Sequence, residues 1–159
     1  MNYIFPTQKL ASPKTNKTPL VLVACGSFSP ITYLHLRMFE MALDWANFEN
    51  FELIGGYFSP VSDEYKKTGL VAATHRVKMC DLAVSKSTWL MVDHWEATQP
   101  TFSRTVTVLD HFDECLNIQD GVLVEGIRKR IKIMLLAGGD LIQSFAVPKL
   151  WAKIDVFLF

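Results

Sequence analysis

Leu20-Val-Leu-Val-Ala-Cys25 is a short apolar run, and Gly26-Ser-Phe-Ser-Pro30 follows it directly. Between Thr32 and Ala46, apolar residues then recur at near-helical spacing. A run of this length and composition is typical of a buried strand, and a glycine and a proline end it. Thr32 is a suitable N-cap for the helix that follows. The stretch therefore predicts a strand, a tight turn and a helix in direct succession.

The same alternation continues along the chain. Further strands are predicted at residues 51–57, 89–92 and 131–137, with another at 154–159, and helices at 72–86, 101–116 and 138–145. Residues 59–69 and 93–100 are predicted as loops. Strands that alternate with helices predict a parallel sheet with right-handed crossovers. We expect a Rossmann-like α/β fold with helices on both faces of the sheet, as a single domain over residues 20–159 after a flexible extension over 1–19.

The composition excludes several classes of protein. The 159 residues carry 16 basic and 16 acidic side chains, and a net charge of zero disfavours general nucleic-acid binding. No run approaches the roughly 18 apolar residues of a membrane-spanning helix. The cysteines Cys25, Cys80 and Cys115 are widely spaced, which disfavours a disulfide framework or a zinc site. We expect an intracellular protein, cytoplasmic or nuclear, without a nucleic-acid or membrane partner.

The loop after the first strand has the chemistry of a phosphate site. Gly26 lets the backbone approach a bulky anion, and the next helix begins with unpaired N–H groups. Ser27 adds a hydroxyl donor, while His35 lies three residues after Thr32 and so on the same helix face. A tight turn with a core histidine fits this loop alone equally well. Neither GxGxxG nor GxxxxGK[ST] occurs in the chain, which disfavours a dehydrogenase and a P-loop enzyme.

Five segments in order resemble the eukaryotic nicotinamide-mononucleotide (NMN) adenylyltransferases, which belong to the nucleotidyltransferase superfamily. The first is Gly26-Ser-Phe-Ser-Pro-Ile-Thr-Tyr-Leu-His-Leu-Arg-Met-Phe-Glu40, and the second is Ser59-Pro-Val-Ser-Asp-Glu-Tyr-Lys-Lys-Thr-Gly-Leu70. His75-Arg76 and Asp93-His-Trp-Glu96 follow, and then Leu135-Leu-Ala-Gly-Gly-Asp-Leu141 with Ser144-Phe-Ala-Val-Pro-Lys-Leu-Trp151. The resemblance covers about residues 20 to 152. It implies the transfer of an adenylyl group from ATP to NMN or to nicotinic acid mononucleotide.

The resemblance also implies roles for individual residues. His35 would hold the ATP phosphates and the charge that develops at the α-phosphoryl group, and Lys66 or Lys67 would reach the triphosphate. The residues expected to bind the two substrates are Gly26, Ser27, Phe28, Lys66, Trp95, Glu96, Phe102, Thr105, Gly138, Asp140, Leu150 and Trp151. Mg²⁺ would accompany ATP, and Trp151 would stack on the cationic pyridine ring. An aromatic face attracts such a cation by roughly 0.5–2 kcal/mol.

Three positions depart from the family pattern. Thr68 stands where many relatives have a third lysine, which leaves open whether Lys66 or Lys67 is the catalytic one. Phe102 stands where a tryptophan is frequent, and Arg104 stands where a carboxylate is common. A positive charge beside a cationic ring would weaken NMN binding or shift the preference between the two mononucleotides.

Structural interpretations of the same residues remain open from the residues alone. Trp95 and Trp151 are also typical of half-buried packing residues, and Lys66-Lys67 of a solvated loop. Asp140 is also typical of a carboxylate that a helix dipole favours. His111 has no partner in the sequence pattern and receives no function.

The C-terminal end suggests an alternative function. The family continues with further strands and a late motif that supplies hydroxyls and an arginine to the triphosphate, and no segment of this sequence matches it. The alternative is therefore a catalytically impaired nucleotide-binding fragment or isoform of the family. The apolar end Val-Phe-Leu-Phe159 would leave a strand edge uncovered, so a homo-oligomer is also expected as one way to cover it.

Overall fold

The computed structural model describes residues 3–147. The elements are β1 (Thr18–Gly26), α1 (Tyr33–Phe48), β2 (Phe51–Pro60), η1 (Asp63–Tyr65), α2 (Ala73–Val84), β3 (Leu90–Val92), η2 (Glu96–Thr98), α3 (Thr105–Leu116), β4 (Val122–Val124), β5 (Ile127–Lys129), β6 (Lys132–Leu135) and α4 (Gly139–Ser144). Four strands form a parallel sheet in the order β3-β2-β1-β6, and β4 pairs with β5 in an antiparallel hairpin. The predicted α/β fold with a parallel sheet is confirmed.

The first strand is buried on both faces because helices cover both sides of the sheet. Leu20 and Leu22 point to the side of α1 and α2, whereas Val21 and Val23 point to the side of α3. None of these four side chains is more than 3% exposed. Successive side chains of a strand point to opposite faces, so a strand covered on both sides has a continuous apolar sequence.

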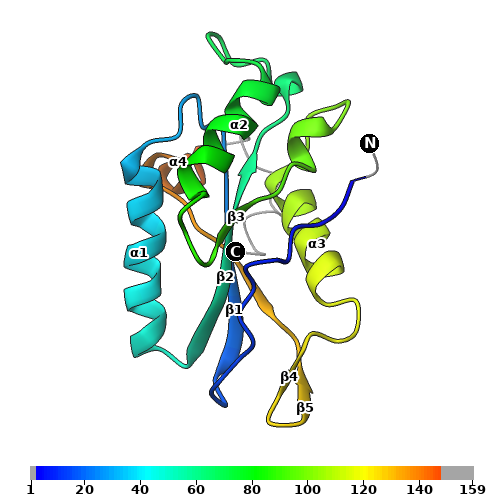
Figure 1. The fold of residues 1–159 in the computed structure, drawn as a ribbon. Coiled ribbons are helices and arrows are strands. Elements are labelled where there is room, and N and C mark those ends of the chain that lie inside the picture. Colours follow the sequence, from blue (N-terminus) through cyan, green and yellow to red (C-terminus); the bar gives the residue numbers. More distant parts are fainter. Residues whose placement is uncertain (1–2, 148–159) are drawn as a thin grey trace.

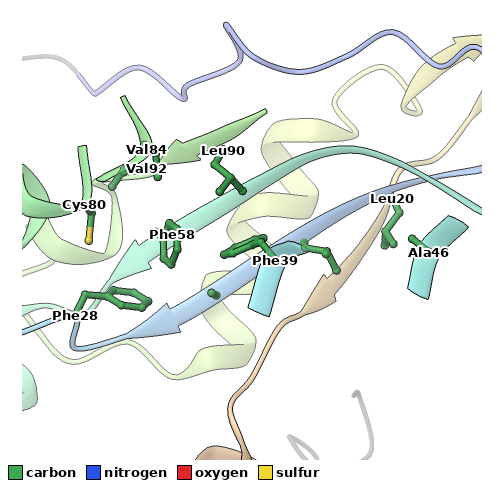
Figure 2. Close-up of a cluster of buried hydrophobic side chains, with 11 residues drawn as sticks. Leu20, Phe28, Phe39, Ala46, Phe58, Cys80, Val84, Leu90 and Val92 are labelled. Atoms are coloured by element: carbon green, nitrogen blue, oxygen red, sulfur yellow. The ribbon is translucent and has the colours of Figure 1, made fainter. Parts of the chain in front are cut away.

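A glycine in β2 allows α1 to pack closely on the sheet. A Cβ atom at Gly56 would lie 2.8 Å from side-chain atoms of both Phe39 and Leu90. Phe39 is fully buried, and its ring meets the ring of Phe58 with centroids 4.8 Å apart (Figure 2). The missing side chain therefore creates the space that the Phe39 ring occupies.

The connections reverse direction at the first strand. From β1 the chain passes through α1 to β2 and through α2 to β3 on one face of the sheet, and α3 on the opposite face leads back toward β6 (Figure 1). β6 pairs with the free side of β1. Parallel sheets of this kind bind ligands outside the carboxyl ends of the strands at such a switch point. The fold thus directs attention to the carboxyl end of β1.

The N-terminal segment packs against the sheet, and the flexibility expected for residues 1–19 stays a prediction. The Tyr57 hydroxyl donates to the carbonyl of Pro6 at 2.7 Å, and the backbone N–H of Ala11 donates to the carbonyl of Ile54 at 2.8 Å. Phe5 and Leu10 pack against the hydrophobic cluster on the α3 side. The polar composition of this segment conceals these contacts, because two apolar side chains are enough to fix it to the sheet face.

Residues 122–129 form a hairpin that the sequence analysis left unassigned. Glu125 and Gly126 connect β4 to β5, with φ values of 50° and 82°. Positive φ at both central residues is the geometry of a type I′ turn, which Asn-Gly and Asp-Gly favour most strongly. Glu-Gly is a weaker indicator, and the strands on either side have only three residues each. The predicted strand at 154–159 lies outside the described residues.

Candidate functional site

A cleft of about 580 Å³ opens at the carboxyl end of β1. Six residues that the sequence predicts as substrate-binding line it: Gly26, Ser27, Glu96, Phe102, Thr105 and Asp140. Seven others that were not predicted complete the lining: Cys25, Val61, Tyr65, Ser103, Arg104, Leu141 and Ser144. The volume falls in the range of small-molecule pockets. The cleft therefore joins loops that are distant in sequence at the switch point of the sheet.

The loop after β1 is supported from below by an aromatic ring. Phe28 has a φ of 44° and is 5% exposed, and its ring meets those of His35 and Phe58 edge to face. A Cβ atom at Gly26 would lie 3.1 Å from the Phe28 ring. The ring of Phe28 therefore packs beneath the loop, while the expected contact of its backbone with a ligand stays a prediction. Gly26 and Ser27 form the surface above it.

His35 is held at the first turn of α1 in a defined orientation. The backbone N–H of Thr32 donates to His35 Nδ1 at 2.9 Å, and the Thr32 hydroxyl lies 2.8 Å from the same atom. Nδ1 is therefore the acceptor, and in the neutral ring the proton resides on Nε2. Burial lowers the pKa of His35, and the negative charge of Asp140 partly opposes this effect. His35 is thus a neutral imidazole whose Nε2–H remains to donate.

A buried arginine connects the loops on one side of the cleft. Arg76 is 0% exposed, and its guanidinium donates to the carbonyls of Val71, Ser27 and Val61 at 2.6, 2.9 and 2.6 Å. It also pairs with Asp63 at 3.0 Å. The planar fork of arginine suits several acceptors at once. The loop after β1 and the loop after β2 are therefore fixed to each other through one side chain.

The two predicted lysines extend from this second loop into solvent. Lys66 adopts the left-handed conformation after η1, with a φ of 53°. Its ammonium lies 3.3 Å from a Glu64 carboxylate oxygen, and 78% of its side chain is exposed. Lys67 is exposed as well. In the described structure the cleft lining on this loop comes from Val61 and Tyr65.

Glu96 is a buried carboxyl group in the cleft wall. It is 3% exposed, and it accepts a hydrogen bond from the Ser59 hydroxyl at 2.5 Å. Burial raises the pKa of Glu96 to about 7, with a further increase from Asp93, while Ser59 and Arg76 act in the opposite direction. This carboxyl group therefore titrates near neutral pH, and its protonated form can donate as well as accept a hydrogen bond.

Trp95 faces α3. Its indole stacks on the His111 imidazole with centroids 4.2 Å apart and an interplanar angle of 8°. His111 Nε2 lies 3.1 Å from the buried carboxylate of Asp93. Trp95, predicted to shape the mononucleotide side, stands behind the cleft wall, next in the chain to Glu96. His111, to which the sequence assigns no function, is its partner.

Two aromatic rings border the cleft beside the start of α3. Phe102 is 50% exposed and stacks on Tyr65, with centroids 5.6 Å apart and an angle of 26°. Thr105 is the first residue of α3, and Arg104 is its N-cap. The helix begins four residues later than predicted. Residues 102–104 therefore precede its first turn, and they line the cleft.

The start of α4 closes the remaining side. Gly138 is the N-cap, and Asp140 lies in the first turn, where the helix dipole favours a carboxylate. Asp140 lines the cleft, whereas Gly138 is not among the lining residues. Leu150 and Trp151, predicted to border the pyridine ring, lie outside the described residues.

Two residues that support the cleft without lining it also received no role from the sequence. Arg76 and Asp93 lie inside the recognised motifs but received no role, because their partners are distant in sequence. Within residues 3–147, no group of three or more histidine, cysteine, aspartate or glutamate side chains is placed to hold a metal ion. In the same part of the chain, no helix is both long and apolar enough to cross a membrane.

Comparisons with known proteins agree with this architecture. The model of the cytidylyltransferase-like family matches residues 23–158. The chain is 57% identical over 163 residues to nicotinamide/nicotinic acid mononucleotide adenylyltransferase 2 of Saccharomyces cerevisiae, covering 98% of this chain and 41% of that protein. It is 56% identical over 160 residues to the enzyme of the same name from Schizosaccharomyces pombe, covering 97% and 44%, and 45% identical over 153 residues to that of Arabidopsis thaliana, covering 95% and 63%.

The chain thus spans about two fifths of the length of the yeast relatives that it matches. The family match extends from the middle of β1 past the start of α4, so it includes every loop that lines the cleft. On this match and on the parallel sheet, the chain belongs to the cytidylyltransferase-like family.

Proposed function

We propose that this chain carries the site at which the adenylyl group of ATP is transferred to NMN or nicotinic acid mononucleotide. The products are NAD, or its nicotinic acid counterpart, and pyrophosphate. The observation that carries the proposal is the cleft itself. Its lining includes the Gly26-Ser27 loop, whose next residue Phe28 contacts the ring of His35, together with a buried carboxyl group and a pair of aromatic rings. The names of the similar proteins support the same reaction.

The reaction requires no nucleophile from the protein. A 5′-phosphate oxygen of the mononucleotide attacks the α-phosphorus of ATP in line, the bond from that phosphorus to the bridging oxygen breaks, and pyrophosphate leaves. Transfers of this type depend on positioning and on stabilisation of the developing charge. These are the tasks that we assign to the residues around the cleft.

On the ATP side, His35 is proposed to donate from Nε2 to a phosphate oxygen, because Thr32 already occupies Nδ1. The backbone and hydroxyl of Ser27 and the N–H groups at the start of α1 would add donors. Lys66 or Lys67 would turn from solvent toward the triphosphate. Asp140 and Gly138 would meet the adenosine.

On the mononucleotide side, Glu96 and Thr105 are proposed as the polar contacts and Phe102 as the stacking ring. Tyr65, which stacks on Phe102, would extend that apolar surface. Trp95 would act from behind the wall. Leu150 and Trp151 remain predictions from the family resemblance.

Mg²⁺ is proposed to enter with ATP. Magnesium in nucleotide sites takes most of its ligands from phosphates and water, with one or two carboxylates from the protein. The described residues fit that mode, since Asp140 offers a carboxylate in the cleft and no multi-carboxylate cage is needed. When bound, the ion neutralises the charge on the phosphates.

An intracellular setting is proposed on the basis of the free thiols of Cys25, Cys80 and Cys115. Self-association remains a prediction from the sequence. Light scattering at several protein concentrations tests it.

Equilibrium binding tests the substrate class. Calorimetric titration of the chain with ATP, NMN, phosphopantetheine and phosphocholine should give binding of ATP and NMN only. Tight binding of phosphopantetheine or phosphocholine in place of NMN would instead assign a different nucleotidyltransferase. Because Arg104 lines the cleft, nicotinic acid mononucleotide is included to measure the preference between the two pyridine substrates.

A further inference from the structure

Asp93 is a fully buried carboxylate at the end of β3. It is 0% exposed, and its N–H donates to the carbonyl of Phe58 at 2.9 Å, which continues the sheet by one residue. A buried carboxylate is costly unless all its oxygens are partnered. The hydrogen-bond partners of the Asp93 carboxylate therefore show which parts of the chain its burial depends on.

The two oxygens of Asp93 are satisfied by three separate parts of the chain. Oδ1 accepts from the Tyr3 hydroxyl at 2.6 Å and from the N–H of Trp95 at 3.4 Å. Oδ2 lies 3.1 Å from His111 Nε2, and the Tyr3 oxygen lies 3.0 Å from the same nitrogen. A proton on Nε2 satisfies both contacts. The N-terminal segment, the end of β3 and α3 thus meet at one side chain.

The same three parts build one wall of the cleft. His111 stacks flat against Trp95, which is followed by the cleft residue Glu96. α3 carries His111 two turns after Thr105, which also lines the cleft. The carbonyl of Trp95 accepts from the side chains of Thr98 and Gln99 at 2.9 Å each, so the turn after Trp95 is tied to the position of that residue.

We propose that Tyr3, Asp93 and His111 are positioning residues for the cleft wall formed by Glu96 and residues 102–105. This inference rests on the proposed function, under which that wall receives the pyridine mononucleotide. The N-terminal segment then contributes to substrate binding from outside the cleft. Its polar end completes a network that fixes the wall, in addition to the apolar contacts of Phe5 and Leu10 with the sheet.

Two tyrosine hydroxyls separate positioning from simple attachment of the N-terminal segment. Tyr3 donates to Asp93, and Tyr57 donates to the carbonyl of Pro6 in the same segment. Tyr3→Phe and Tyr57→Phe each remove one hydroxyl and keep the ring. Each variant therefore loses one hydrogen bond that attaches the N-terminal segment to the rest of the chain. The Tyr3 hydroxyl alone of the two reaches Asp93.

The experiment uses the full chain and both variants. Calorimetry gives the Kd for NMN and for ATP, and hydrogen exchange gives the protection of the amides of residues 95–99. For Tyr3→Phe we expect a Kd for NMN raised about tenfold, the upper range of coupling for a residue that does not touch the ligand. Its Kd for ATP should change less than twofold, and residues 95–99 should exchange faster. Tyr57→Phe should leave the ratio of the two Kd values and this exchange unchanged.

Equal effects of the two variants, or an equal loss of both ligands in Tyr3→Phe, would overturn the inference and leave only attachment of the segment. Unchanged exchange at residues 95–99 in Tyr3→Phe would overturn it as well. Failure of the unmodified chain to bind NMN would instead refute the proposed function. The exchange comparison then still decides whether the network positions the wall.

Discussion

At the scale of single residues, the proposed chemistry assigns the main roles to two ionisable groups. His35 is fixed through Nδ1 by Thr32, and burial lowers its pKa, so it acts as a neutral donor. Glu96 is buried beside Ser59 with a pKa raised to about 7. Each group is set by its immediate environment, and each can be tested by a single substitution.

Replacing His35 by alanine should lower the rate of adenylyl transfer by about 10²-fold or more, as for loss of a donor to developing charge. The free energy of unfolding should fall by about 1 kcal/mol at most, because the lost contacts are those of a helix cap. Steady-state kinetics and urea denaturation measure the two quantities. If the free energy of unfolding fell in parallel with activity, the proposed catalytic role of His35 would be contradicted.

Glu96 should make stability depend on pH. Its pKa in the folded chain is above its unfolded value, so the folded state binds more protons between pH 4.5 and about 7. The stabilisation that the protonated Glu96 gives the folded state is present in full below pH 4.5 and is lost as the pH rises through about 7. Glu96→Gln, compared with the unmodified chain by urea denaturation at pH 5 and pH 8, should be relatively more stable at pH 8. An equal difference at both pH values would contradict a raised pKa.

The residues that sequence reasoning located are those whose role is local. Gly26, Ser27 and Thr32 follow from the order of strand, turn and helix. The contacts of Arg76 with Ser27 and of Tyr3 with Asp93 could not be predicted, because they join residues 49 and 90 positions apart. The motif that contains Phe28 marks the loop but does not predict that the phenylalanine ring is buried beneath it.

At the scale of elements, close packing of α1 on β2 and the connection of two loops by Arg76 build the site. Strand and helix periodicity in the sequence predicted α1, β1 and β2 because these elements are long. It missed the β4–β5 hairpin, whose three-residue strands are largely exposed, but predicted β3, whose three residues are apolar and all buried. The predicted start of α3 is four residues too early. Threonine is a favoured N-cap residue, so Thr101 indicates a helix start, whereas the actual N-cap, Arg104, is not of a favoured type.

Gly56→Ala should destabilise the fold by about 1–3 kcal/mol, the usual effect of overpacking. The added methyl group would meet Phe39 and Leu90 at 2.8 Å. Gly139→Ala is the matched control, since a Cβ there has no heavy atom within 4 Å among the described residues. Thermal unfolding of both variants measures the difference, and equal melting temperatures would contradict the packing.

Arg76→Met should destabilise the chain by about 3 kcal/mol or more, because it leaves three carbonyls without a donor and Asp63 without its ion-pair partner. Arg37→Met on the exposed face of α1 should change stability by less than about 0.5 kcal/mol. Urea denaturation compares them. A small effect at Arg76 would mean that the two loops hold their positions without it.

At the scale of the whole molecule, the sheet order places the cleft where the chain reverses direction at β1. Strand-helix alternation predicted the parallel sheet but not the order of its strands, and the family match over residues 23–158 agrees with the parallel α/β fold. The contribution of the N-terminal segment was not predicted, because its packing depends on a sheet face that forms only in the folded chain. Leu150 and Trp151, which the family resemblance predicts for the pyridine side, lie outside the described residues.

The central claim is that this cleft transfers an adenylyl group to a pyridine mononucleotide. The direct measurement is NAD and pyrophosphate formation when the purified chain is incubated with ATP, NMN and Mg²⁺, with His35→Ala in parallel. The account predicts NAD and pyrophosphate in equal amounts, with the rate strongly reduced in His35→Ala. Binding of ATP and NMN without any NAD would contradict catalysis by this chain and assign it a nucleotide-binding role alone.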